Sequence, residues 1–208
     1  MERNRNVNLD GSIVKMQEIT KNIKVADDRN EMMGLEGAVS NEYFKALQSF
    51  IPEDFMFMGR FRRPAPDVVN VMLNYGYGIL YSLVRNAISR SSLNPYKGVL
   101  HASYKDQEAL VYDLIEEFRQ PVVDRVVITM LGRRQVSHTD YSSQDGACKI
   151  EEGFKKNFAD EVLSKLDSYT VYNGRKERYG RIIQLQAQRL KDAIIEGTEY
   201  EPFVYKRR

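Results

Sequence analysis

The stretch Asp67–Ser91, DVVNVMLNYGYGILYSLVRNAISRS, decides the fold of this 208-residue chain. Its apolar residues cover most of the circumference of a helix, a pattern typical of a helix that is buried on nearly all sides. We therefore predict a long central helix against which other helices pack. Asn70 and Asn74 need hydrogen-bond partners if they are buried there, and Gly76 would let a neighbouring helix come close.

Tyr75 and Tyr77, on the same helix, leave two interpretations open. Their rings either point into a functional site or, as large residues on a buried helix, belong to the core. The glycines Gly76 and Gly78 form no phosphate-binding loop, because such a loop would need a preceding strand.

A second informative stretch, Tyr96–Arg125, reads YKGVLHASYKDQEALVYDLIEEFRQPVVDR. Apolar residues recur at helical spacing over 107–118, and a break is expected at Pro121, which suits the first turn of another helix. Asp113 and Glu116 are three residues apart, so both carboxylates lie on one helical face. They lie beside the apolar stripe, and we expect them to be partly buried.

His101 lies just upstream of this helix, after a turn that contains glycine, where its ring could reach the same face. One imidazole and two nearby carboxylates are the donors of a site for a hard cation such as Mg²⁺ or Mn²⁺. The alternative is an ordinary amphipathic helix with solvated acids and a histidine that is hydrogen-bonded elsewhere.

The N-terminal part of the chain is expected to form two helices, Ile13–Val25 and Asp28–Phe50. The second contains Glu36 between Gly34 and Gly37, and glycine inside a helix needs a reason because it is destabilising there. The reason is either the close approach of another backbone or ligand, or a break in the helix. Small and apolar neighbours make an unpaired carboxylate at Glu36 costly, and a cation would remove that cost.

The rest of the chain predicts loops and further helices. Residues 51–66 form a loop with prolines and glycines, and residues 132–147 form an exposed loop with a short hairpin. His138 and Asp140 lie in the second loop, but nothing nearby completes a metal-ligand set. Because alternating strand patterns are nearly absent, we predict an all-α protein. The remaining helices are expected at Val122–Leu131, Ile150–Leu166 and Arg175–Ile195, the last ended by Gly197.

Composition limits the possible classes of protein. Hydrophobic residues make up 42% and charged residues 29% of the chain, as in a soluble globular protein. No apolar run approaches the length of a membrane span, and the polar start MERNRNVNLDG is not a signal peptide. The single cysteine, Cys148, excludes an internal disulfide and suits the reducing cytoplasm. We expect one cytoplasmic domain, with a linker or helix at 1–27 and a core at 28–208.

Several segments, spread from end to end, together resemble the catalytic half of the CRISPR-associated adaptation integrase. This family is the metal-dependent nuclease-integrase that inserts new spacers into CRISPR arrays. Each segment is weak on its own, but the combination is specific. The segments are GLEG at 34–37, RRPAPDVVNVMLNYGYGILYSLVR at 62–85, LNPYKGVLH at 93–101, DLIEEFRQPVVDR at 113–125, DGACKIEEGFKKNF at 145–158, and the closing helix with its YEPF tail.

The resemblance implies a metal-binding and catalytic triad of Glu36, His101 and Glu116, with Mn²⁺ or Mg²⁺ as the cofactor. Many members carry aspartate at the third position, and glutamate is an accepted variant. Asp113 matches a further acidic position one helical turn earlier, which implies a residue that supports the ligands or an alternative ligand. The imidazole nitrogen of His101 favours Mn²⁺ over Mg²⁺.

The family normally begins with a β-rich domain that builds its homodimer, and the 35 residues before Glu36 are too few for that domain. We therefore expect a chain without it, which puts dimerisation and assembly of an integration complex in doubt. The resemblance implies two partners, which are double-stranded or branched DNA and a small second CRISPR adaptation protein. No membrane is implied.

The implied function is cleavage and transesterification of DNA phosphodiesters during spacer acquisition. Two alternatives stay open, a catalytically idle DNA-binding or scaffold protein of the same fold and a phosphohydrolase of small phosphoesters. Between Arg175 and Lys191 six basic residues accompany one acid, which is expected of a phosphate-binding face and equally of a solvated helix. The candidates for contacts with DNA phosphates are Arg60, Arg62, Arg63, Arg175, Arg178 and Arg181.

Overall fold

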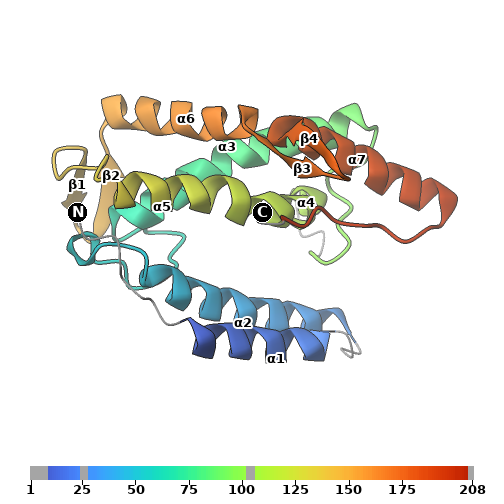
Figure 1. Ribbon diagram of the computed structural model, residues 1–208, viewed down its shortest axis with the longest axis horizontal. Coiled ribbons are helices and arrows are strands. Elements are labelled where there is room, and N and C mark those ends of the chain that lie inside the picture. The colour runs from blue at the N-terminus through green and yellow to red at the C-terminus, as the bar shows by residue number, and fades with distance from the viewer. Residues whose placement is uncertain (1–8, 24–27, 102–105, 206–208) are drawn as a thin grey trace.

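A computed structural model describes residues 9–23, 28–101 and 106–205, and it is mostly helical, as predicted (Figure 1). Its sheets are two small antiparallel hairpins. The helices in chain order are α1 (Asp10–Ile23), α2 (Arg29–Gln48), α3 (Val68–Arg90), α4 (Ala109–Phe118), α5 (Arg125–Gly132), α6 (Glu152–Asp167) and α7 (Tyr179–Glu196), with a 3₁₀ turn η1 (Glu53–Phe55) and a π-helical turn η2 (Arg119–Asp124).

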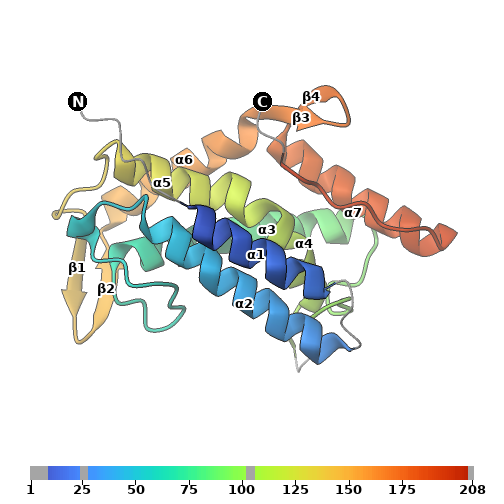
Figure 2. The same cartoon turned by 60° about the horizontal axis from the view of Figure 1, so that its bottom comes forward.

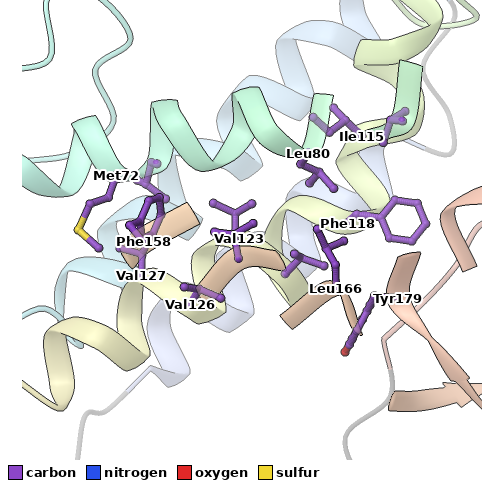
Figure 3. Packing of buried hydrophobic residues seen from close by; sticks show 14 of the residues in the cluster. Met72, Leu80, Ile115, Phe118, Val123, Val126, Val127, Phe158, Leu166 and Tyr179 are labelled. Carbon is purple, nitrogen blue, oxygen red and sulfur yellow. The ribbon is translucent and has the colours of Figure 1, made fainter. Parts of the chain in front are cut away.

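The central helix is α3, and the prediction for 67–91 is confirmed almost to the residue. It packs against α4, η2, α6 and α7, and its inward side chains form one apolar core with theirs (Figure 3). A Cβ on Gly76 would lie 2.5 Å from Val123 Cγ1, so the missing side chain is what lets η2 approach. The buried amide of Asn70 donates to the Gly59 carbonyl and accepts from the Phe61 N–H, which fixes the preceding loop on α3.

The break predicted at 119–121 is wrong, because α4 continues through η2 directly into α5. Proline lacks the N–H that an α-helical turn would use, and its ring clashes with the carbonyl four residues back. In a π turn the backbone hydrogen bonds join residues five apart instead of four, and this turn accommodates Pro121 without ending the helix.

Two hairpins interrupt the helices, β1–β2 (Tyr141–Gln144, Ala147–Ile150) and β3–β4 (Tyr169–Tyr172, Arg175–Arg178). The first lies where a hairpin was expected. The second corrects the predicted helix Arg175–Ile195, whose first four residues are strand β4, while α7 begins at Tyr179. The helix ends at Gly197, as predicted, in a left-handed conformation with φ of 66°.

Helices α1 and α2 lie side by side along one edge of the helical bundle (Figures 1 and 2). No residue of α1 is buried, and the buried residues of α2 all lie between positions 44 and 47. α2 is unbroken, and a Cβ added at Gly34 or Gly37 would meet no atom within 4 Å. Neither a helix break nor a close neighbour among the described residues therefore explains these glycines.

The C-terminal tail folds back onto the bundle, where Phe203 is buried and stacks on Phe118 with ring centroids 5.5 Å apart. Glu117 of α4 holds the tail by accepting hydrogen bonds from Tyr200 Oη at 2.6 Å and from the Phe203 N–H at 2.7 Å. It also accepts from Nε2 of the buried Gln186 at 2.9 Å. None of the helices in the described ranges is both long and apolar enough to cross a membrane.

Candidate metal and DNA site

One cavity of about 370 Å³ is lined by all four acidic and imidazole residues that the sequence singled out. Glu36 comes from α2, His101 from the loop before α4, and Asp113 and Glu116 from α4. Residues up to 80 positions apart in sequence are therefore gathered at one hollow between α2 and α4. The fold brings together the components of the predicted site.

Asp113 organises the loop that carries His101. Its carboxylate accepts hydrogen bonds from the backbone N–H groups of Val99, Leu100 and His101, and it lies 2.8 Å from His101 Nδ1. A Cβ on Gly98 would meet the His101 carbonyl at 2.4 Å and Asp113 Oδ2 at 2.9 Å, so this tight wrapping requires glycine. A neutral His101 that donates from Nδ1 keeps Nε2 as its unprotonated nitrogen, the form in which histidine binds metals.

Glu116 differs from Asp113 in exposure. The side chain of Asp113 is 13% exposed, as expected for a partly buried acid, whereas that of Glu116 is 41% exposed, which corrects the prediction of partial burial. Arg119 Nη1 donates to Glu116 Oε1 at 2.5 Å. The guanidinium of Arg119 also stacks over the ring of Tyr77, 4.2 Å from its centroid. Tyr77 is thus part of this site.

The sequence did not single out Asp124, although it is buried at the back of the same cavity with 1% of its surface exposed. Tyr43 Oη donates to one carboxylate oxygen at 2.7 Å, and Tyr77 Oη donates to the other at 2.6 Å. Burial raises the pKa of Asp124, and these two hydrogen bonds oppose the rise. The signal in the sequence that could have pointed to Asp124 is its position between two valine pairs, in the segment PVVDRVV.

The donors fit a hard divalent cation in kind, since they combine two carboxylates and one imidazole. They are not gathered as tightly as a bound ion requires, because no three His, Cys, Asp or Glu side chains in the described ranges are close enough together to hold one. Glu116 is hydrogen-bonded to Arg119 instead. A bound cation would therefore compete with Arg119 for the carboxylate of Glu116.

A second cavity, of about 880 Å³, shares Tyr77, His101, Glu116 and Arg119 with the first. Three of the six arginines proposed to contact DNA also line it, namely Arg60, Arg62 and Arg63. The two cavities therefore adjoin at these four residues, with Glu36, Asp113 and Asp124 lining only the first and Arg60, Arg62 and Arg63 lining only the second.

The six arginines differ in how they are held. Arg60 donates to the amide oxygens of Asn70 and Asn74, and burial lowers its pKa, so much of its guanidinium serves the fold. Arg175 and Arg178 lie on β4, and Arg181 lies in the first turn of α7, outside both cavities.

His138 and Asp140 serve a local turn. His138 Nδ1 contacts Tyr141 Oη at 2.8 Å, and Asp140 accepts from the N–H of Ser137 at 2.7 Å.

Comparison with known proteins identifies the family. The family described as "CRISPR associated protein Cas1" matches residues 1–163. The chain is 38% identical over 207 residues to CRISPR-associated endonuclease Cas1 1 of Methanospirillum hungatei JF-1, covering 99% of this chain and 62% of that protein. It is 37% identical over 184 residues to the Archaeoglobus fulgidus protein of the same name, covering 86% of this chain and 53% of the relative. The chain therefore spans less than two thirds of these relatives.

Solved structures share the fold. A Cas1 protein from Thermotoga maritima superposes with a TM-score of 0.82 at 24% identity, covering 90% of this chain and 58% of that one. A casposase bound to an integration product gives 0.83 at 23% identity, covering 89% of this chain and 53% of that one. The family match over 163 of 208 residues, the relatives and the shared fold lead to one conclusion. The chain belongs to the Cas1 family of CRISPR-associated proteins.

Proposed function

We propose that this chain is a divalent-metal-dependent DNA endonuclease and integrase of CRISPR adaptation, with Glu36, His101 and Glu116 as its metal ligands. The observation that carries the proposal is the shared cavity of these residues, in which Asp113 holds Nδ1 of His101. Relatives named as endonucleases, and the fold shared with a casposase bound to an integration product, agree with this function. Manganese is preferred to magnesium because one ligand is an imidazole.

When bound, the cation would stabilise charge on the phosphate under attack and activate the nucleophile, which is water in cleavage or a DNA 3′-hydroxyl in integration. The chain's own residues prepare the site. Asp113 fixes the tautomer of His101 and the path of its loop. Arg119, released from Glu116, is placed to neutralise a phosphate oxygen at the junction of the two cavities.

Arg62 and Arg63 give the DNA backbone a path towards the ligands, since both line the cavity that also contains His101 and Glu116. Contacts of this kind position DNA without reading its sequence, and they make binding salt-sensitive. We propose a small second adaptation protein as the partner for integration, in agreement with the fold shared with a partial Cas6-RT-Cas1–Cas2 complex at a TM-score of 0.85 and 23% identity, covering 97% of this chain and 61% of that one.

The experiment is cleavage of branched and duplex DNA by the purified chain with Mn²⁺, with Mg²⁺, or with a chelator. Each of Glu36→Ala, His101→Ala and Glu116→Ala is expected to abolish cleavage while the thermal melt stays within a few degrees. Glu152→Ala is the matched control, because Glu152 is an exposed acid on α6 that pairs with Lys155 and lines neither cavity. Its cleavage is expected to equal that of the wild type.

Two results would contradict the assignment. Wild-type cleavage by Glu116→Ala would make Asp113 the ligand in place of Glu116. DNA binding with no metal-dependent cleavage under any condition would favour the alternative, a catalytically idle DNA-binding or scaffold protein. The pairing of Glu116 with Arg119 is the observation that keeps this alternative in view.

A further inference from the structure

The helix that carries Glu36 owes little of its position to packing near that residue. The buried residues of α2 all lie between positions 44 and 47, more than two turns beyond Glu36. Beside Glu36 itself, added Cβ atoms at Gly34 and Gly37 would meet nothing within 4 Å. Core packing thus anchors α2 at its C-terminal end, and among the described residues polar contacts contribute to the orientation of the part that carries Glu36.

Two side chains of α2, Arg29 and Tyr43, make hydrogen bonds that connect the neighbourhood of Glu36 to other parts of the chain, and we call these contacts ties. Each residue lies seven residues from Glu36, one before and one after, and seven residues are close to two helical turns. All three side chains therefore share one face of α2. Arg29 donates from Nη2 to the carbonyl oxygen of His101 at 2.5 Å and from Nε to that of Leu100.

The second tie leads to the segment that carries Glu116. Tyr43 Oη donates to Asp124, whose other oxygen accepts from Tyr77 Oη. The ring of Tyr77 lies under the guanidinium of Arg119, which holds Glu116. Asp124 ends the π turn η2, and such turns occur frequently at functional sites. One tie thus joins α2 to the backbone of His101, and the other joins it to the support of Glu116.

We propose that Arg29, Tyr43 and Asp124 are positioning residues of the metal site, which orient α2 so that Glu36 lies opposite His101 and Glu116. This inference rests on the metal-dependent function proposed above. Breaking a tie leaves every ligand in the chain but lets Glu36 move away from the other two. The loss then appears as weaker metal binding, and residues that support metal ligands typically contribute roughly 10–100-fold to affinity.

The test measures Mn²⁺ affinity by titration calorimetry, into the millimolar range, for Tyr43→Phe, Asp124→Asn and Arg29→Gln. Each substitution is made in the wild-type background and in a Glu36→Gln background. In the wild-type background each is expected to weaken Mn²⁺ binding about tenfold. In the Glu36→Gln background it is expected to change nothing, because the ties act through Glu36. A purely structural role would weaken binding equally in both backgrounds.

Tyr200→Phe is the matched control, because it also removes a tyrosine hydroxyl that donates to a carboxylate, that of the half-buried Glu117, on the tail side of α4. Its Mn²⁺ affinity is expected to equal that of the wild type. Unchanged affinity in both Tyr43→Phe and Arg29→Gln, or equal weakening in both backgrounds, would overturn the inference. If the wild type binds no Mn²⁺, the proposed function fails, and amide hydrogen exchange then tests separately whether these contacts orient α2. Faster exchange of the amides of residues 29–43 in Tyr43→Phe than in the wild type would support that role, and unchanged exchange would overturn it.

Discussion

Two carboxylates seven residues apart, the half-buried Glu117 and the buried Asp124, both accept hydrogen bonds from tyrosine hydroxyls, yet they connect different parts of the molecule. Glu117 joins α4 to the C-terminal tail and to Gln186 of α7. Asp124 joins η2 to Tyr43 of α2 and to Tyr77 of α3, beside the candidate metal cavity. Burial raises the pKa of both.

The comparison shows that similar hydrogen bonds can serve either stability or the geometry of a site. The two carboxylates differ in whether the segment that each one binds is also anchored by apolar packing. The tail is also secured by the buried ring of Phe203, so Glu117 adds stability to a segment already packed. Near Glu36, α2 has no such apolar anchor among the described residues, so Asp124 contributes to the geometry of the cavity.

The largest expected effect on stability comes from Glu117→Ala. This change leaves Gln186 Nε2, Tyr200 Oη and the Phe203 N–H without their carboxylate acceptor, and buried groups left unpaired cost about 1–3 kcal/mol. For a chain of this length that lowers the melting temperature by several degrees. Mn²⁺ affinity is expected to stay at the wild-type value. A tenfold loss of Mn²⁺ affinity, measured by calorimetry, would remove the distinction between the two carboxylates.

The cavity side and the tail side are also expected to differ in DNA binding. Reversing the charge of both Arg62 and Arg63 should weaken duplex binding. The slope of log affinity against log salt should fall by roughly 0.9 for each phosphate that these side chains no longer neutralise. Arg189→Glu is the control on the tail side, because Arg189 pairs with Glu201 at 2.6 Å. Filter-binding titrations from low to physiological salt measure the slope.

Reversal of Arg178 and Arg181 is expected to lower the same slope by less, since Arg178 already bonds to Tyr169 and pairs with Asp167. An unchanged slope for Arg62 and Arg63 would show that the larger cavity is not part of the DNA path. An unchanged slope for Arg178 and Arg181 would remove β4 and the start of α7 from it.

The smallest expected effect is on the pH dependence of the free energy of unfolding, to which both carboxyl groups should contribute. Burial raises the folded-state pKa of Asp124 above its ordinary 3.8 and that of Glu117 above 4.5, so the folded state binds more protons than the unfolded state between the two values. The stability each contributes is present below its ordinary pKa and is lost as the pH rises through the folded pKa.

Asp124→Asn and Glu117→Gln no longer titrate at these positions. Each variant should therefore gain stability relative to the wild type as the pH rises from about 4. Urea melts over a pH series measure this difference. A difference that is constant with pH, for either variant, would show that the carboxyl concerned has the same pKa in both states.

The central helix and most other helices could be predicted because their apolar periodicity is local information. The hairpin at 169–178 was missed, although Asn173–Gly174 is a strong signal for a two-residue turn. Both residues adopt positive φ, 49° and 79°. The basic residues of 175–178 looked like the start of the following helix, and strand pairing outweighed that pattern.

The sequence singled out four of the residues that line the candidate cavity, but not Asp124 and not the contacts that connect these residues. Resemblance pointed to Glu36, His101 and Glu116, and helical spacing placed Asp113 beside Glu116. The contact of Asp113 with His101 depends on a tight turn at Gly98, and the ties from Arg29 and Tyr43 span 72 and 81 residues. No local pattern encodes contacts over such separations.

The most direct test of a metal site at Glu36, His101 and Glu116 is an anomalous-scattering map from crystals soaked in Mn²⁺. The account predicts one strong peak in the cavity between α2 and α4, in direct contact with these three side chains, with Asp113 bonded to His101 and outside the coordination sphere. A peak bound to Asp113 in place of Glu116, a peak elsewhere in the molecule, or no peak at saturating Mn²⁺ would contradict it.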